Sequence, residues 1–423
     1  MFDQKKLMMK MFEAAISAAH PQTNLHDYHL PPIPKNGKLI VVGAGKAALA
    51  MLEKVERHYQ QSPHYHQVSG LIVAPDGNHV NSDRIKLVNA SHPLPDQRSV
   101  DAAKRILKMV SHLTKDDQVL VLLSGGASSL ICLPIFPITL ENKRTLIKQL
   151  FNAGATIQEI NAVRQHFSQI KGGKLAAACY PAKVRTLSIS DVVGDQPEII
   201  GSGPTVETIS NTNDIKRILS KYNIHSSVDL SLLDNHNLQS QPTPHNTYEL
   251  IARPIDSLIA AAKVAQKSNY LTVILGDNIE GEATIVAQEI VSNIFSSFNL
   301  EQKWAIISGG EVTVTMGDNH QNPNGGPNRE FALALAIQLN NHANIFALSA
   351  DTDGVDGKSS KTECIAGAFI TPTTLKRAHQ CGLDANKLLT AHQSGDFFNL
   401  LGDQVITGQT QTNVNDFRIV LIN

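Results

Sequence analysis

Residues 119–126 read VLVLLSGG and residues 304–310 read WAIISGG, so an apolar, strand-like run leads straight into Ser-Gly-Gly in each half of the chain. A strand that ends in adjacent glycines exposes backbone N–H groups and lets a ligand approach the main chain closely. Ser124-Gly125-Gly126 and Ser308-Gly309-Gly310 therefore predict two domains that face each other across a cleft for an anionic ligand. Two ordinary strand-to-turn exits would give the same pattern.

Short apolar runs and helical patterns alternate along the rest of the chain. In the first half, runs such as 38–42 and 184–190 are separated by helical patterns, and the alternation resumes beyond residue 246. This alternation predicts a parallel sheet covered by helices on both faces. A stretch rich in Ser, Asn, His, Gln and Pro, from about residue 225 to 246, is typical of a linker. We expect two α/β domains, 1–240 and 241–423.

The composition excludes several classes of partner. Of 423 residues, 42% are hydrophobic and 18% are charged, with a formal net charge of -1, so no global basic field is available to hold nucleic acid or an anionic membrane. Aromatic residues, at 5%, are too scarce for base-stacking platforms. The four cysteines form no CxxC pair, which is typical of reduced thiols. No apolar run reaches the roughly 20 residues that span a bilayer. We expect a cytoplasmic protein without a nucleic-acid or membrane partner.

The segment Gly43-Ala44-Gly45-Lys46-Ala47-Ala48 follows a predicted strand and opens a predicted helix. It fits the G-x-G-x-x-A fingerprint of dinucleotide-binding folds. However, Lys46 adds a positive charge to the positive end of a helix, which favours an anion such as a phosphoryl group at this turn. A tight turn with a solvent-exposed lysine is the third interpretation.

Two further clusters contain charged residues next to glycines. Arg164 and the run Lys171-Gly172-Gly173-Lys174 bring cations to a helix junction, where they would form either an anion-binding nest or a lysine-rich helix cap. Arg329, in Gly325–Glu330 at the start of a predicted helix, is suited to bidentate capture of a carboxylate or phosphate, although a surface arginine would look the same.

Carboxylates follow two of the predicted strands. Asp191 and Asp195 come after the strand at 184–190, where they could hold Mg²⁺, accept a substrate proton, or serve in a turn. The segment Asp351–Gly357 lacks the EF-hand pattern and would be either a looser acidic loop or a plain Asp-Gly turn. The sequence contains neither GxxxxGK[ST] nor GxSxG, which argues against a P-loop NTPase and a nucleophile-elbow hydrolase.

Taken in order, these motifs resemble the class II glycerate kinases, the glycerate 2-kinase family whose C-terminal half is the MOFRL domain. The resembling segments are 43–48, 91–96, 123–130, 161–175, 188–205, 308–330, 351–357 and 408–416. The resemblance implies a Rossmann-like N-terminal domain, a MOFRL-type α/β domain, an active site in the cleft between them, and phosphorylation of the 2-hydroxyl of D-glycerate by ATP and Mg²⁺. Some members are labelled hydroxypyruvate reductase, and an NAD(P)H-dependent hydroxypyruvate reductase is the alternative function. A non-catalytic sugar-acid or nucleotide sensor is a third.

The family's catalytic lysine corresponds to Lys46. Many members read Gly-Gly-Arg-Asn-Gln-Glu where this chain has Pro327 at the arginine position and Arg329 two residues later. Members often carry Gly-Pro-Thr-Gly-Thr-Asn where this chain has Gln411 in place of the second glycine. These departures could change the role of the arginine and the shape of the last loop.

The resulting hypothesis gives each candidate residue a role. Lys46 stabilises the transferring phosphoryl group, Asp191 holds Mg²⁺ with Asp195 or acts as the base, and Arg329, with Arg164 or Lys171, holds the glycerate carboxylate. The expected substrate- and phosphate-binding residues are Gly43, Gly45, Ser124, Gly125, Gly126, Arg164, Lys171, Ser308, Gly309, Gly310 and Asn328. The partners are small molecules, D-glycerate and ATP, and the oligomeric state is left open, with a homodimer among the options.

Overall fold

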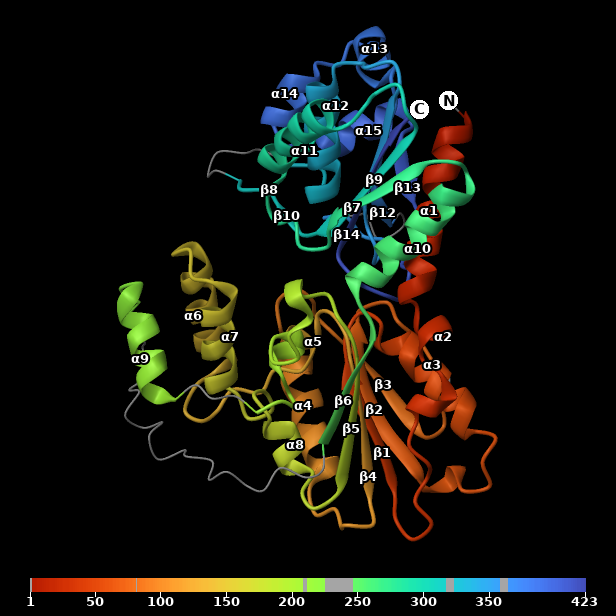
Figure 1. The fold of residues 1–423 in the computed structure, drawn as a ribbon. Coiled ribbons are helices and arrows are strands. Elements are labelled where there is room, and N and C mark those ends of the chain that lie inside the picture. The colour runs from red at the N-terminus through yellow and green to blue at the C-terminus, as the bar shows by residue number, and fades with distance from the viewer. Residues whose placement is uncertain (1, 81, 208–210, 225–245, 317–322, 358–363) are drawn as a thin grey trace. The chain divides into compact units, whose positions relative to one another are not determined.

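The structure, a computed structural model, describes residues 2–80, 82–207, 211–224, 246–316, 323–357 and 364–423 (Figure 1). The chain divides into two compact units. The N-terminal unit is Pro21–Ile251, and the C-terminal unit combines Met1–His20 with Ala252–Asn423. The predicted linker lies outside the described residues, apart from Asn246. The cleft expected between the domains stays a prediction.

A six-stranded sheet in the order β3-β2-β1-β4-β5-β6 forms the centre of the N-terminal unit. Its strands are β1 (Leu39–Ala44), β2 (Val68–Pro75), β3 (Ile85–Ala90), β4 (Gln118–Leu123), β5 (Lys183–Ile189) and β6 (Asn246–Ala252). Strands β1 to β5 pair in parallel. In doubly wound sheets of this order, ligands bind beyond the carboxyl ends of the strands where the order reverses, here between β1 and β4. Ala44 and Leu123, which end these strands, are partners in the register.

Helices surround this sheet and form a smaller cluster beside it (Figure 1). The helices are α2 (Pro21–Asn24), α3 (Ala48–Tyr59), α4 (Gln97–Val110), α5 (Ala127–Leu130), α6 (Leu140–Asn152), α7 (Ile157–His166), α8 (Lys174–Ala178) and α9 (Thr212–Lys221), with 3-10 turns at Asp27–His29, Tyr65–Gln67, Val193–Asp195 and Ile200–Ser202. Ile40 and Val42 of β1 pack with Ile106 of α4 in the main core. Leu150 and Ile215 belong to a second core, shared by α6, α7 and α9.

The C-terminal unit has a mixed sheet in the order β13-β12-β11-β14-β9-β7. Its strands are β7 (Leu271–Gly276), β9 (Trp304–Gly310), β11 (Ile345–Asp351), β12 (Ile365–Ile370), β13 (Gln404–Ile406) and β14 (Asp416–Ile422), and a small ladder joins β8 (Gly281–Glu282) to β10 (Val312–Thr313). Strand β7 pairs with β9 in parallel, and the other neighbours in the large sheet are antiparallel.

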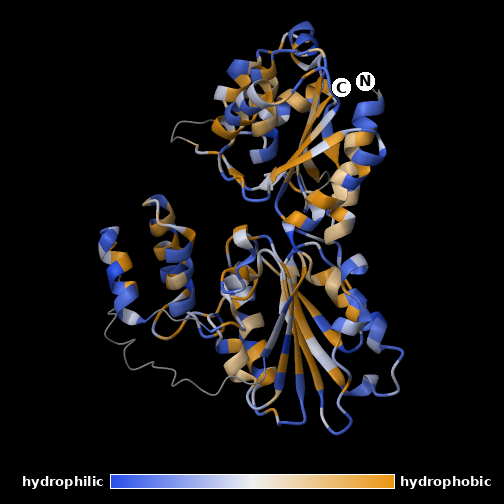
Figure 2. Ribbon diagram, viewed as in Figure 1, coloured by the Kyte–Doolittle hydropathy of each residue, from blue (hydrophilic) through white to orange (hydrophobic). Residues whose placement is uncertain are grey.

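Alternating residues of this second sheet face two layers of helices. The helices are α1 (Phe2–Ala19), α10 (Pro254–Lys267), α11 (Ala283–Ser297), α12 (Pro327–Leu339), α13 (Thr374–Gln380), α14 (Ala385–Thr390) and α15 (Ser394–Leu401). Ile306 packs in the core that contains α11 and α12, whereas its neighbour Ile307 packs in the core that contains α1 and α10. In Figure 2 the strands of both units are largely hydrophobic, as expected for sheets buried on both faces.

The predicted fold class, two α/β units each built on its own sheet, is confirmed. The first helix differs from the expected division at residues 240 and 241, because α1 packs with the C-terminal sheet. Met8 and Phe12 are fully buried there, and the Phe12 ring stacks on Phe417 with centroids 5.5 Å apart. No helix of the described residues is long and apolar enough to cross a bilayer.

The two Ser-Gly-Gly segments differ in structure. Ser124 follows the end of β4, as the sequence predicts. Strand β9, in contrast, continues through Gly310, so the expected strand exit at Ser308 is wrong. Ser308 and Gly310 pair with Arg418 and Asp416 of β14, and this pairing keeps the segment inside the sheet.

Candidate active site

Two turns at the carboxyl edge of the N-terminal sheet are joined by hydrogen bonds. Gly45 and Lys46 follow β1, and Ser124 and Gly125 follow β4. The backbone N–H of Lys46 donates to the Gly125 carbonyl at 2.8 Å, and the N–H of Ala47 donates to Ser124 Oγ at 3.0 Å. Because Ser124 is fully buried, these bonds hold the two turns together as one unit.

The backbone amides of Gly125 and Gly126 are open donors at this edge. No described residue accepts a hydrogen bond from either N–H. Gly126 has a φ of 81°, and a Cβ at this position would lie 2.8 Å from the His92 ring and 3.6 Å from Lys46 Cγ. The half-buried side chains of Lys46 and His92 therefore border the amides. Adjacent N–H groups beside a lysine suit an anion such as a phosphoryl group.

Close packing leaves no room for a side chain at Gly43 or Gly45. A Cβ on Gly43, inside β1, would lie 2.1 Å from the Leu122 carbonyl oxygen. A Cβ on Gly45, whose φ is 143°, would lie 2.0 Å from Ser124 Oγ. In a dinucleotide fold the amides of this turn face the pyrophosphate. Here the amide of Lys46 bonds instead to the turn after β4, which favours an anion beside the Lys46 side chain over a dinucleotide.

Asp191 and Asp195 lie beyond β5, which neighbours β4 in the sheet, and both are half-buried. Burial raises the pKa of Tyr248 on β6 to about 12, and the negative charges of Glu198 and Asp191 add to this rise. Mg²⁺ is usually held by one or two carboxylates together with substrate phosphates, and two aspartates supply that donor set. No group of three or more His, Cys, Asp or Glu side chains gathers among the described residues.

The lysines near the end of α7 point into the protein. Lys143 donates to the carbonyls of Arg164 and Phe167 at 2.9 and 3.0 Å. Lys174 donates to the carbonyls of Gln165 and Ser168 at 2.7 and 2.5 Å. These bonds cap the C-terminal end of α7, so for Lys174 the helix-cap interpretation of this cluster is correct.

Lys171 and Arg164 have different environments. Lys171 is 1% exposed and donates to both the carbonyl and the hydroxyl of Ser128, on the helix that follows the Ser-Gly-Gly turn. Arg164 is half-buried, and its guanidinium lies 5.5 Å from the centre of the Phe151 ring. Burial lowers the pKa of both cations, and that of Lys171 falls well below its ordinary value. The structure therefore gives Lys171 a protein partner in place of a solvent-facing anion site.

Arg329 is buried at the start of α12 and forms an ion pair with Asp356. Each of the two residues is 1% exposed. Arg329 donates from Nε to Asp356 Oδ2 at 2.9 Å and from a terminal nitrogen to the Asp356 carbonyl at 2.6 Å. The carboxylate also accepts the backbone N–H groups of Asn328 and Arg329, at 2.8 and 3.0 Å, and so caps the helix. Pro327 is the first residue of α12, a position where its fixed φ and missing N–H are tolerated.

Asn328 belongs to a second buried network in this unit. Its Nδ2 donates to Asp416 Oδ1 at 2.6 Å, and its Oδ1 accepts from Ser349 Oγ at 2.6 Å. Asp416 also accepts from the Val312 amide at 2.8 Å and from the Arg418 guanidinium at 2.6 Å. With Asn328 only 1% exposed, this amide joins α12 to the ends of β11 and β14.

The loop at Asp351–Gly357 packs on the loop at Gly408–Asp416. The Thr410 hydroxyl donates to the Thr352 carbonyl at 2.5 Å, and Asp353 Oδ1 accepts the Val355 amide at 2.7 Å, which is the bonding of a turn. Gln411 has a φ of 57°, so the chain keeps a left-handed conformation where the resembling family often has glycine.

Comparisons with known proteins match nearly the whole chain. Residues 7–235 match the domain of unknown function DUF4147, and residues 304–416 match the MOFRL family. D-glycerate 2-kinase of Thermotoga maritima is 33% identical over 100% of both chains. The chain belongs to the glycerate 2-kinase (MOFRL) family. A solved glycerate kinase structure from the same organism superposes with a TM-score of 0.85 and covers 100% of both chains at 31% identity. An Agrobacterium vitis protein that is provisionally named a hydroxypyruvate reductase is 39% identical over 99% of this chain and 94% of its own length.

The residues that support this candidate site were only partly identified from the sequence. Ser128, Asp356 and Asp416 each lie inside a motif shared with the family, but nothing in their spacing shows which side chains they bind. His92, beside Gly126, lies in the family segment 91–96. The motifs therefore showed where in the sequence these residues lie, but they did not show which side chains contact each other.

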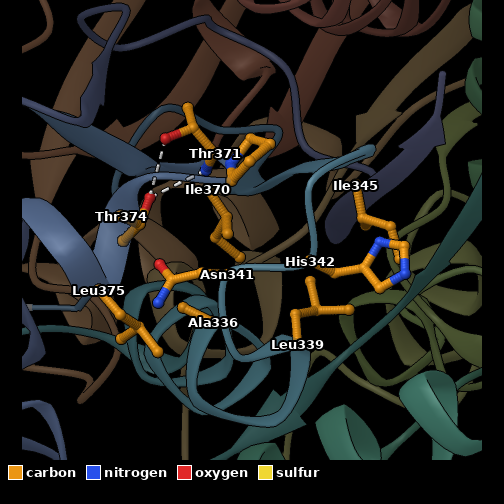
Figure 3. Close-up of a pocket in the computed structure, with 10 residues that line it drawn as sticks. Ala336, Leu339, Asn341, His342, Ile345, Ile370, Thr371, Thr374 and Leu375 are labelled. Carbon is orange, nitrogen blue, oxygen red and sulfur yellow. Dashed lines mark hydrogen bonds between the residues drawn. The ribbon is translucent and has the colours of Figure 1, made fainter.

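A small pocket elsewhere in the C-terminal unit is unrelated to these motifs. It lies between α12, β11, β12 and α13 (Figure 3). Its wall includes Ile345 and Ile370, whereas the carboxylate of Asp351 lies at the other end of β11. Thr371 and Thr374, which are hydrogen-bonded to each other, form its polar side.

Proposed function

We propose that this protein transfers the γ-phosphoryl group of ATP to the 2-hydroxyl of D-glycerate, with Mg²⁺, to give 2-phosphoglycerate and ADP. The observation that carries the proposal is the edge of the N-terminal sheet, where the open amides of Gly125 and Gly126 lie beside the Lys46 side chain. Its relatives that are named glycerate kinases support the choice of substrate.

In this proposal Lys46 and the two glycine amides stabilise the phosphoryl group during transfer. The glycerate oxygen forms a bond to the γ-phosphorus while the bond from phosphorus to the bridging oxygen of ADP breaks. The transferring group carries dispersed negative charge, so a fixed cation and preorganised N–H donors lower the barrier more than any covalent chemistry would. The hydrogen bond from the Lys46 amide to Gly125 fixes the base of the lysine relative to those donors.

We assign Asp191 and Asp195 to Mg²⁺ or, for Asp191, to the proton of the 2-hydroxyl. Their carboxylate oxygens are hard ligands beyond the carboxyl end of β5, and oxygen donors are the type that Mg²⁺ prefers. When bound, Mg²⁺ would neutralise phosphate charge. A base at Asp191 would accept the proton that the substrate hydroxyl loses as the new P–O bond forms.

Arg329, Asn328 and Lys171 receive positioning roles in this proposal. The guanidinium of Arg329 is committed to Asp356, and the amide of Asn328 is committed to Asp416. Of the cations expected to hold the glycerate carboxylate, Arg164 is the one that is half-buried, and we keep it in that role. The cytoplasmic location and the homodimer stay predictions.

A reductase that uses NAD(P)H and hydroxypyruvate is the competing function. The fingerprint at Gly43–Ala48 and the name of the Agrobacterium vitis relative favour it. Against it, the Lys46 and Ala47 amides that a pyrophosphate would use already donate to the turn after β4.

A pair of lysine variants tests the proposed function. Lys46→Met should lower ATP-dependent ADP release with D-glycerate by about 100- to 1,000-fold, as expected for the loss of one preorganised donor. Lys54→Met, on α3 and eight residues beyond Lys46, should leave turnover unchanged. Near-normal turnover in Lys46→Met would refute the role of this lysine. Nicotinamide oxidation with hydroxypyruvate and no ADP release in the wild type would establish the reductase.

A further inference from the structure

One buried lysine connects three loops of the N-terminal unit. Lys171 lies between α7 and α8, Ser128 lies on α5 after the Ser-Gly-Gly turn, and Ser202 lies beyond β5. The Lys171 ammonium donates to the Ser128 carbonyl and, at 2.6 Å, to the Ser128 hydroxyl. The Ser128 and Ser202 hydroxyl oxygens are 2.9 Å apart. Lys171 and Ser202 are almost fully buried.

The direction of this hydrogen-bond chain is fixed at both ends. The Ser202 hydroxyl donates to Asn161 Oδ1 at 2.9 Å, so it must accept from Ser128. Because the Ser128 hydroxyl gives its one hydrogen to Ser202, it accepts from the Lys171 nitrogen. Each hydroxyl therefore has one donor and one acceptor, and the chain leaves little freedom for the rotation of α5.

Backbone hydrogen bonds hold the loop that carries Lys171 against the loop that carries Ser202. The amide of Gly172 donates to the Ser202 carbonyl at 3.1 Å, and the amide of Gly173 donates to the Gly203 carbonyl at 2.8 Å. Both glycines have positive φ values, 61° and 80°, which side chains adopt only at a cost. The loop therefore presents the lysine inward, toward Ser128.

We propose that Lys171 is a positioning residue for phosphoryl transfer: through Ser128 it fixes α5, and thereby sets the Gly125 and Gly126 amides beside Lys46. This inference rests on the proposed function. Ser128 lies two residues after Gly126, and the Ser129 amide bonds back to the Gly126 carbonyl at 3.1 Å, so a shift of α5 moves the turn. The role differs from the substrate contact that the sequence suggests for Lys171.

A direct role for Lys171 as an anion ligand is disfavoured by its surroundings. Burial lowers its pKa well below the ordinary value, an effect that Cys132 opposes only in part, and the nearby cations Lys143 and Arg164 add smaller lowering effects. The side chain is 1% exposed, so its nitrogen has no route to a ligand while it holds Ser128.

Lys143→Met is a matched control for Lys171→Met. Lys143 is also a buried lysine of this unit, 4% exposed, but it donates to the carbonyls of Arg164 and Phe167 and not to α5. Both variants should be destabilised. Only Lys171→Met should lower kcat, by about tenfold to a hundredfold, because a misplaced donor reduces catalysis without removing substrate binding. The KM for D-glycerate should change less than kcat.

Hydrogen–deuterium exchange measured by mass spectrometry tests the proposal without any assay of activity. Lys171→Met should speed exchange in residues 124–131, whereas Lys143→Met should speed it in 157–167. Unchanged exchange at 124–131 would overturn the positioning role, as would a kcat equal to that of Lys143→Met. A raised KM for D-glycerate at constant kcat would make Lys171 a substrate contact instead.

Ser202→Ala keeps the proposal falsifiable if Lys171→Met does not fold. This variant removes one hydroxyl from the chain and no charge, and it should also speed exchange at 124–131 and lower kcat. Normal values of both would overturn the proposal. If the variants show the expected changes in exchange but the wild type releases no ADP with D-glycerate, the proposed function fails while the positioning of α5 stands.

Discussion

Replacing Arg329 with methionine separates a structural role of this arginine from a substrate-binding role. The change removes the Nε bond to Asp356 Oδ2 at 2.9 Å and the bond to the Asp356 carbonyl at 2.6 Å. It leaves the Asp356 carboxylate buried without its counter-charge. Breaking a buried ion pair in this way typically costs about 3–5 kcal/mol, so we expect Arg329→Met to lower the free energy of unfolding by that amount.

The cost should depend on pH, with a sign set by the carboxyl group. Burial raises the pKa of Asp356 to about 6, against the lowering effect of Arg329. Without the arginine the pKa of Asp356 rises further. Asp356 of the folded variant is then protonated over a pH range above 6 in which Asp356 of the wild type is still charged. A neutral carboxyl needs no counter-charge. The difference in stability between wild type and variant should therefore be larger at pH 8 than at pH 5.

Chemical denaturation at the two pH values measures this difference. Arg98→Met is the control, because Arg98 forms an exposed ion pair with Asp76 and Asp96 and should change stability little at either pH. The double variant Arg329→Met/Asp356→Asn should recover part of the loss, since it removes the uncompensated charge. Unchanged stability in Arg329→Met, together with a raised KM for D-glycerate, would refute the structural role and restore the arginine as a substrate contact.

Three further predictions follow from single sites. Gly45→Ala should destabilise the protein by about 2–5 kcal/mol and abolish turnover, because its Cβ would lie 2.0 Å from Ser124 Oγ. Gly77 also has a positive φ, 93°, but nothing lies within 4 Å of its Cβ position, so Gly77→Ala should cost only about 1–2 kcal/mol of backbone strain and keep full activity. Burial lowers the pKa of Lys174 to about 7, so between pH 7 and 10 this lysine binds a proton more strongly in the unfolded chain than in the folded protein. The free energy of unfolding of wild type relative to Lys174→Gln should therefore rise with pH, by at most about 1.4 kcal/mol per pH unit, as measured by thermal or urea denaturation. EDTA should stop ADP release, and Asp191→Asn should raise the Mg²⁺ concentration for half-maximal activity; full turnover in EDTA would contradict the metal assignment.

The sequence predicted the sheets better than it predicted the partners of the site residues. The strand at 119–123 and the turn after it follow from an apolar run that ends in glycines, and the structure has both. The same pattern at 304–310 failed to show where the strand ends, because pairing of Gly310 with Asp416, far away in sequence, extends β9. Local composition carries no information on such a partner.

Side-chain partners were the least predictable part of the site. Arg329 at the start of a helix has the same sequence signature whether it faces a ligand or a buried aspartate, and only the fold places Asp356 beside it. Lys171 is similar, since its position beside Ser128 depends on how α5 packs on the turn at Ile200–Ser202. The first helix was assigned to the other domain for a related reason: an apolar face does not specify which sheet will cover it.

The most direct test of the proposed reaction is phosphorus NMR of wild-type protein with D-glycerate, ATP and Mg²⁺. We expect the resonance of 2-phosphoglycerate to grow at the rate at which ATP is converted to ADP, and we expect Lys46→Met to suppress both. A resonance of 3-phosphoglycerate would contradict transfer to the 2-hydroxyl. Unchanged ATP and D-glycerate, with nicotinamide oxidised when hydroxypyruvate is supplied, would contradict phosphoryl transfer altogether.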